Sequence, residues 1–180
     1  MQVPLVMTVI GRDRPGLVES LASIIADHGG NWLESRMCRL GGEFAGILRV
    51  LVPVENQNAL KQDLGQLQSQ GLTVVVQTDQ SQPAFQSRRL MTLELVGHDR
   101  PGIIRQITHV LVNQGVNIEE LNTECVSAPM SGETLFKAQA KLLIPYSCNL
   151  ARLRTELEKL ADELMVDLTL GGFEPPHKAE

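Results

Sequence analysis

Hydrophobic and polar positions alternate in some segments of the chain and follow a helical spacing in others. Leu5, Met7 and Val9 alternate with other residues, which predicts a strand with one buried face. Within residues 17–25, apolar side chains recur three and four positions apart, which predicts an amphipathic helix. Segments with the alternating pattern and segments with the helical spacing follow one another through the first half of the chain. They predict strand, helix, strand, strand, helix and strand in that order.

Turn residues set the expected limits of these elements. Pro15 suits the first turn of a helix, and Gly29 suits a left-handed helix end. Gly41-Gly42 predicts a tight hairpin turn, and a proline at position 53 ends the third strand. The predicted later elements of the first half are strands at 31–40, 43–52 and 72–78, and a helix with Leu60, Leu64 and Leu67.

The second half of the chain repeats the first. The segment Gly11-Arg12-Asp13-Arg14-Pro15-Gly16-Leu17 recurs 86 residues later as Gly97-His98-Asp99-Arg100-Pro101-Gly102-Ile103. At the same offset Asn31 matches Asn117. About six extra residues at 127–132 raise the later offset to 92. The turn, the apolar positions of the first helix and the G-x-N segment after it all recur. This repetition predicts two copies of one unit.

The element order βαββαβ predicts the fold of each copy. It is typical of the α+β ferredoxin-like sandwich, an antiparallel sheet with its helices on one face. A polar segment separates the two copies. The predicted divisions are a first domain at 1–79, a linker at 80–88, a second domain at 89–172 and a flexible tail at 173–180. Small units leave sheet edges exposed, so we expect the two domains to pack together.

Composition and charge narrow the class of protein. Hydrophobic residues make up 43% and charged residues 21%, which is ordinary for a globular protein. The net charge is −5, and neither half is basic, which argues against direct binding of nucleic acid. No segment is long and apolar enough to cross a membrane, and the first residues lack the features of a signal peptide. We therefore expect a cytoplasmic protein.

Cysteine and histidine spacing argues against metal and disulfide chemistry. Three cysteines occur without a C-x-x-C pair, and four histidines occur without metal-binding spacing. We expect no metal and no cofactor. No phosphate loop or fixed nucleophile–base pair is visible either, so an enzyme is the less favoured class. The adjacent Arg88 and Arg89 are expected to be solvated at the start of a strand.

The repeated turn is the candidate binding element. It joins the first strand to the first helix of each copy, where free backbone N–H groups and the helix dipole can hold a carboxylate. Asp13 and Asp99 either receive an ammonium group or cap the helix, and the cap is the favoured interpretation. Asn31 and Asn117 are expected to face the same corner with their amides. The predicted ligand-binding residues are Asp13, Arg14, Gly16, Asn31, Asp99, Arg100, Gly102 and Asn117.

The D-R-P-G-[LI] turn, the apolar helix and the following G-x-N resemble the ACT domain family in both copies. That resemblance implies βαββαβ regulatory modules, many of which bind amino acids. A pair of such modules without a catalytic domain resembles the family's transcriptional regulators. This implies control of glycine cleavage genes, glycine as effector, and action through a DNA-binding activator protein, with a homo-oligomer possible. His98 replaces Arg12 in the second turn, so the two corners are not expected to be equivalent.

A second class of function stays open. The chain would then be a tandem ACT module that binds a protein and no small molecule. Stabilisation by a ligand separates a sensor from such a module, and turnover of a substrate separates either from an enzyme.

Overall fold

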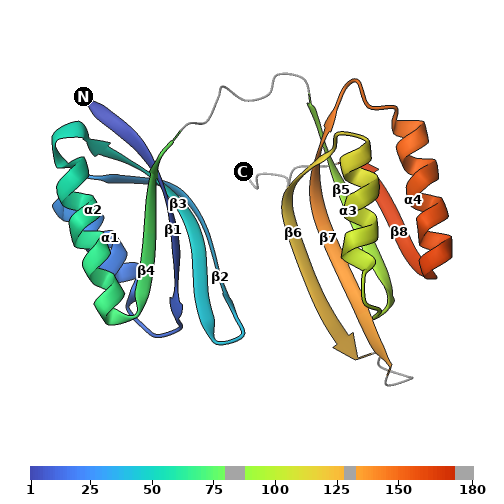
Figure 1. Cartoon of the computed structure of the whole chain (residues 1–180), viewed down its shortest axis with the longest axis horizontal. Helices are drawn as coiled ribbons and strands as arrows, with labels where there is room; N and C mark the ends of the chain where they lie inside the picture. The colour runs from blue at the N-terminus through green and yellow to red at the C-terminus, as the bar shows by residue number, and fades with distance from the viewer. Residues whose placement is uncertain (80–87, 128–132, 173–180) are drawn as a thin grey trace, which may run out of the picture. The chain divides into compact units, whose positions relative to one another are not determined.

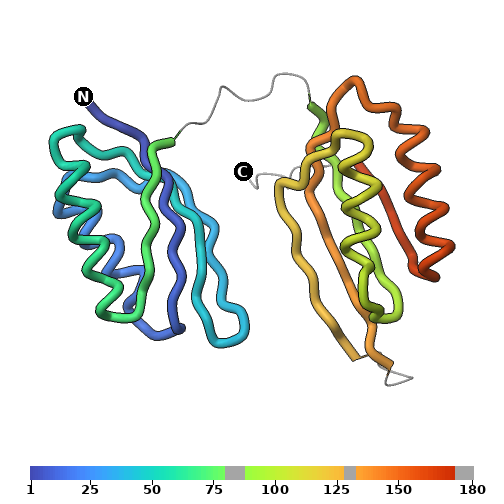
Figure 2. The backbone as a smooth tube through the Cα atoms, viewed as in Figure 1, coloured from blue at the N-terminus to red at the C-terminus, as the bar shows by residue number. Residues whose placement is uncertain are grey.

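The computed structural model describes residues 1–79, 88–127 and 133–172. The chain divides into two compact units, Met1–Gln82 and Pro83–Glu180. Each unit is a twisted sheet with its helices on one face (Figures 1 and 2). The predicted tail lies outside the described residues, as does the predicted linker except for Arg88, which already belongs to a strand. No helix in the described ranges is long and apolar enough to span a membrane.

The first unit has the predicted βαββαβ order. Its sheet has the strand order β2-β3-β1-β4, and each neighbouring pair is antiparallel. Its elements are β1 (Gln2–Arg12), α1 (Leu17–Asp27), β2 (Asn31–Leu40), β3 (Glu43–Pro53), the 3₁₀ turn η1 (Val54–Asn56), α2 (Gln57–Gln66), the 3₁₀ turn η2 (Leu67–Gln70) and β4 (Leu72–Thr78). The ferredoxin-like fold predicted from the sequence is confirmed.

The second unit repeats this arrangement. Its strand order is β6-β7-β5-β8, again with antiparallel neighbours. Its elements are β5 (Arg88–His98), α3 (Ile103–Asn113), β6 (Asn117–Ser127), β7 (Thr134–Pro145), α4 (Leu150–Leu164) and β8 (Val166–Gly172). Both edge hairpins shift register at the same place, between Trp32 and Glu34 and between Ile118 and Glu120. The duplication therefore extends to irregular features of the backbone.

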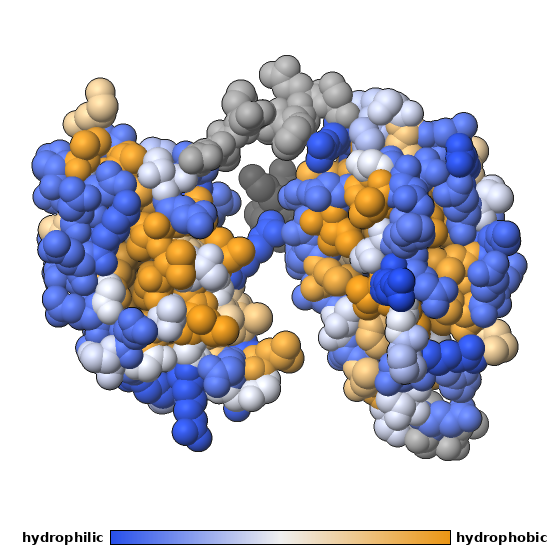
Figure 3. All heavy atoms as spheres, viewed as in Figure 1, coloured by the Kyte–Doolittle hydropathy of each residue, from blue (hydrophilic) through white to orange (hydrophobic). Residues whose placement is uncertain are grey.

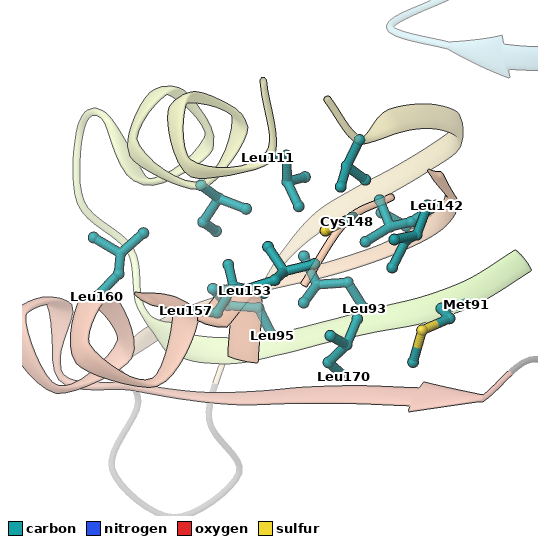
Figure 4. Close-up of a cluster of buried hydrophobic side chains, with 14 of the residues drawn as sticks. Met91, Leu93, Leu95, Leu111, Leu142, Cys148, Leu153, Leu157, Leu160 and Leu170 are labelled. Carbon is teal, nitrogen blue, oxygen red and sulfur yellow. The ribbon is translucent and has the colours of Figure 1, made fainter. Parts of the chain in front are cut away.

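Each hydrophobic core lies between the helices and one sheet face. In α1 the buried side chains are Leu17, Leu21 and Ile25, which recur every fourth residue and so lie on one side of the helix. Figure 4 shows the corresponding core of the second unit, where side chains of β5, α4 and β8 meet. The helical stripe predicted from the sequence is confirmed at these positions, but Val18 is 45% exposed.

The uncovered faces of the two sheets, which we call the open faces, differ in chemistry. In the first unit Thr8 pairs with Ile47 and Val75, whose exposed fractions are 56% and 51%. At the equivalent place in the second unit Glu94 pairs with Gln139 and Thr169. Figure 3 shows how hydrophobic and hydrophilic residues are distributed over the visible side of each unit. The two units thus share a backbone but present different surfaces.

Glycines set the limits of the first helix in each unit. Gly29 and Gly115 follow the helix ends with φ of 69° and 67°, as predicted. At the start, the prediction that the helices begin at Pro15 and Pro101 is wrong by two residues. Gly16 has a φ of 90°, which lies outside the range of a right-handed helix. The helix α1 therefore begins at the next residue, Leu17.

Candidate ligand-binding site

The first corner connects β1 to α1. Its backbone is fixed to the neighbouring hairpin, because the Asp13 N–H donates to the Gly42 carbonyl oxygen at 2.9 Å. Gly16 is the N-cap of α1, and no side chain caps the helix. The N–H groups of the first turn therefore keep the positive end of the helix dipole available to an anion. Arg14 is exposed and donates from Nη2 to the Gln70 carbonyl oxygen at 3.3 Å.

The second corner has the same backbone design. The Asp99 N–H donates to the Thr134 carbonyl oxygen at 3.2 Å. Gly102, with φ of 95°, is the N-cap of α3, again without a side-chain cap. His98 Nδ1 lies 3.7 Å from Glu133 Oε2. Arg100 is half-buried beside Asp99 in the turn.

The two aspartates do not cap the helices, so the favoured interpretation from the sequence is wrong. A glycine holds the N-cap position in each unit, three residues after the aspartate. In the first corner Asp13 Oδ2 instead accepts a hydrogen bond from Arg39 Nε at 2.7 Å. Cys125 occupies the place of Arg39 in the second unit, since each pairs with the matching phenylalanine of its hairpin. The second corner therefore lacks this ion pair.

The asparagines lie at the other end of each sheet from the corner. Asn31 pairs with Leu51, which pairs with Pro4 near the start of β1, whereas the corner follows Arg12 at the end of β1. Eight residues of strand separate the two places, or about 27 Å. The second unit has the same arrangement, with Asn117 paired with Leu143 and Leu143 with Leu90.

The expectation that the asparagine faces the corner of its own unit is therefore wrong. The reason is topological, because α1 returns the chain to the start of β1 before the next strand begins. Asn31 and Asn117 are both exposed at the first residue of an edge strand. The structure thus brings Asp13, Arg14 and Gly16 together, and likewise Asp99, Arg100 and Gly102. It places each asparagine elsewhere.

Charged pairs on the open faces are features that the sequence analysis does not single out. In the first unit Arg49 Nε lies 2.6 Å from Asp79 Oδ2, and the Asp79 side chain is only 6% exposed. In the second unit Lys141 Nζ lies 2.6 Å from Glu120 Oε2. The alternation of the third strand indicates that residues 49 and 141 face away from the core. Asp79 follows β4 and Glu120 lies in β6, so no local motif reveals these pairs.

Within the described ranges no group of three or more His, Cys, Asp and Glu side chains is positioned to hold a metal ion.

The fold and the repeated corner place the chain among proteins built from tandem ferredoxin-like modules. The ACT domain family matches it twice, over residues 3–77 and 89–170. The chain therefore belongs to the ACT domain family.

Two solved structures resemble the whole chain. A protein of unknown function from Galdieria sulphuraria superimposes with a TM-score of 0.82 and 29% identity, covering 97% of this chain and 100% of that one. A proposed glycine cleavage system transcriptional repressor superimposes with a TM-score of 0.69 and 20% identity, covering 97% and 99%. At 20% identity the second likeness concerns the fold. None of the curated proteins compared with the chain matches it.

Proposed function

We propose that this chain is a non-enzymatic regulatory protein that binds a small amino acid and acts through a protein partner. Two ACT domains account for residues 3–77 and 89–170, and the architecture is that of a proposed glycine cleavage system transcriptional repressor. Glycine is accordingly the first candidate ligand. A DNA-binding activator protein is the proposed partner, since the net charge of −5 disfavours direct binding to DNA.

The observation that carries this proposal is the glycine-capped corner, and it is strongest in the second unit. A ligand carboxylate would accept hydrogen bonds from the N–H groups at the start of α3, which no side chain caps. The Asp99 carboxylate would receive the ligand ammonium. Asp99 is exposed, and within the described part of the chain its carboxylate has no hydrogen bond or ion pair. Asp13, in contrast, already pairs with Arg39.

The size of the ligand limits its affinity. Glycine has five heavy atoms, and a ceiling of about 1.5 kcal/mol per atom gives at most about 7.5 kcal/mol, or micromolar binding. The ligand alters the partner interaction only if it binds one conformational state more tightly than another. Asn31 and Asn117 stay proposed ligand-binding residues, but they cannot contact a ligand held at the corner of their own unit. Their contribution therefore has to be measured separately from that of the corner.

Calorimetric titration of the full chain with glycine, alanine and serine tests the corner. We expect the wild type to bind at least one of them, and Asp99→Asn to weaken binding about tenfold, because a charge-assisted hydrogen bond to the ammonium is lost. Asp13→Asn is the matched variant in the other unit and should weaken binding less, since Asp13 is engaged by Arg39. An Asp99→Asn protein that folds and binds like the wild type would contradict the placement of the site.

One observation favours the alternative function, a protein-interaction module without a small ligand. The open face of the first unit exposes an apolar group formed by Ile10, Ile47 and Val75 on three adjacent strands. The fold itself does not demand this surface, because the second unit has polar side chains at the positions of Ile47 and Val75. Such a face is suited to an apolar surface on a protein partner.

A further inference from the structure

A hollow of about 480 Å³ lies on the open face of the second unit. It is far from the corner, because its floor is the part of β5 that pairs with the end of β8. A neighbouring hollow of about 340 Å³ shares Glu94 and Gln139 with it. The side chains and backbone that form the larger hollow include Thr92, Glu94, Glu120, Gln139, Lys141 and Gly171.

The hollow exists because Gly171, near the end of β8, leaves a position on the open face without a side chain. Gly171 pairs with Thr92, and a Cβ atom added to Gly171 would meet nothing within 4 Å. In the first unit the equivalent residue is Gln77, which pairs with Val6. A side chain is therefore compatible with the backbone at this position. Its absence in the second unit opens the space above the sheet.

The hollow contains charges of both signs and an amide. Lys141 Nζ donates to Glu120 Oε2 at 2.6 Å, and the two side chains keep 40% and 30% of their surface exposed. Gln139 Nε2 donates to Glu94 Oε1 at 3.0 Å. Glu94 and Lys141 are diagonal neighbours on one sheet face, about 7–8 Å apart between Cα atoms. The hollow therefore presents an anionic and a cationic side chain on the same face of the sheet.

In the first unit, the cationic side chain at the position of Lys141 binds a carboxylate. Arg49 is the equivalent of Lys141, and its Nε binds the Asp79 carboxylate at 2.6 Å. The Asp79 side chain is 6% exposed. The residues at the positions of Glu94 and Gln139 are Thr8 and Ile47, which offer no anion. The second unit thus adds an acceptor for a cation beside a site suited to a carboxylate.

We propose that this hollow is a second binding site, separate from the corner, for a small zwitterion such as a free α-amino acid. The ligand carboxylate binds Lys141, its ammonium group binds Glu94, and the Gln139 amide orients it. The ligand class rests on the proposed function, but the location does not depend on the corner. Asn117 starts β6, the strand that contributes Glu120, but it is not among the residues that form the hollow.

The test is a titration of the ¹⁵N-labelled full chain with glycine, followed by NMR. We expect saturable shifts of the Gly171 and Gly172 amides. Gly171→Gln, which copies the first unit and fills the hollow, should abolish these shifts, with Gly172 as the remaining reporter. Lys141→Gln and Glu94→Gln should each weaken binding about tenfold, because each removes a charge-assisted contact. Lys159→Gln on α4, outside the hollow, is the control and should bind as the wild type does.

Acetate and methylamine serve as probes of the two half-sites. Acetate should shift the resonances around Lys141 and methylamine those around Glu94, each more weakly than glycine. Shifts confined to residues 99–103 would overturn the hollow and leave the proposed function standing. Shifts at Gly171 and Gly172 that persist unchanged in Lys141→Gln and Glu94→Gln would overturn the assigned contacts. An absence of saturable shifts with glycine, alanine and serine would overturn both the hollow and the proposed function.

Discussion

Arg89 is the residue at which the second unit departs most clearly from the first. Its equivalent is Val3, a partly buried side chain packed against the first core. Arg89 lies on the core side of β5, where its Nε is buried and has no hydrogen-bond partner among the described residues. Its guanidinium lies 5.0 Å from the centre of the Tyr146 ring. The expectation of a solvated arginine is therefore wrong for Arg89.

We predict that Arg89→Val leaves the free energy of unfolding unchanged or raises it by about 1 kcal/mol. The substitution removes a buried unsatisfied N–H group, which outweighs the loss of a partly exposed cation–π contact. Denaturant unfolding of the two proteins measures the difference. Arg89→Lys also removes the Nε–H group but keeps the positive charge and the contact with the ring, so it should raise the free energy of unfolding at least as much as Arg89→Val does. A loss of more than 1 kcal/mol in Arg89→Val would contradict this interpretation of the site.

Contacts between residues that are far apart in the sequence determine which charged groups are available at the corner. The D-R-P-G segment correctly predicts a strand-to-helix turn, because proline and glycine restrict the backbone locally. It does not reveal that Arg39 reaches Asp13, since that contact depends on how the hairpin folds against the corner. The position of the asparagines could have been predicted from the order of the elements. A helix that follows a strand returns the chain toward the start of that strand, so a residue after the helix lies opposite the corner.

At the scale of elements, a polar side chain links the two helices of each unit at the same place. In the first unit His28 Nε2, just after α1, lies 2.8 Å from Asp63 Oδ2 of α2. In the second unit Gln114 Nε2 donates to Glu156 Oε2 of α4 at 2.9 Å. The duplication thus preserves the link while changing its chemistry. Apolar periodicity predicts which helices pack together, but it does not predict which polar pair joins them.

Glu156 gives this link a pH dependence. Hydrogen bonds from Arg152 and Gln114 to its carboxylate lower its pKa below the ordinary value of 4.5. A carboxylate with a lowered pKa in the folded state contributes stability above its unfolded pKa and loses it as pH falls through the folded pKa. We therefore predict that Glu156→Gln makes the stability of the chain less dependent on pH in the acid range below 4.5.

Unfolding by denaturant at a series of pH values measures this effect. The wild type should lose more stability on acidification than Glu156→Gln does. Glu158→Gln, on the same helix, is the matched control and should follow the wild type. Parallel curves for Glu156→Gln and the wild type would show that the link contributes nothing to the pH dependence.

At the scale of the whole molecule, two copies of one fold carry different surfaces. The fold and its duplication were predicted from the sequence, because the turn and the apolar pattern of the first helix repeat at an offset of 86 residues and the third strand at an offset of 92. The difference between the open faces was not predicted, because it depends on how β1, β3 and β4 align in the first sheet and how β5, β7 and β8 align in the second. The apolar face of the first unit supports the alternative function as a protein-interaction module. The charged hollow of the second unit is the proposed site for a small zwitterion.

The proposed function requires that the chain recognises a free amino acid. Thermal unfolding of the full wild-type chain with and without each of the twenty amino acids tests it most directly. We predict that glycine or another small amino acid raises the unfolding temperature in a concentration-dependent manner. At 100 times its Kd the ligand should add about 2.7 kcal/mol of stability. If none of the twenty stabilises the chain at millimolar concentration, the proposed amino-acid binding is contradicted, and a protein-interaction module without a small ligand is favoured.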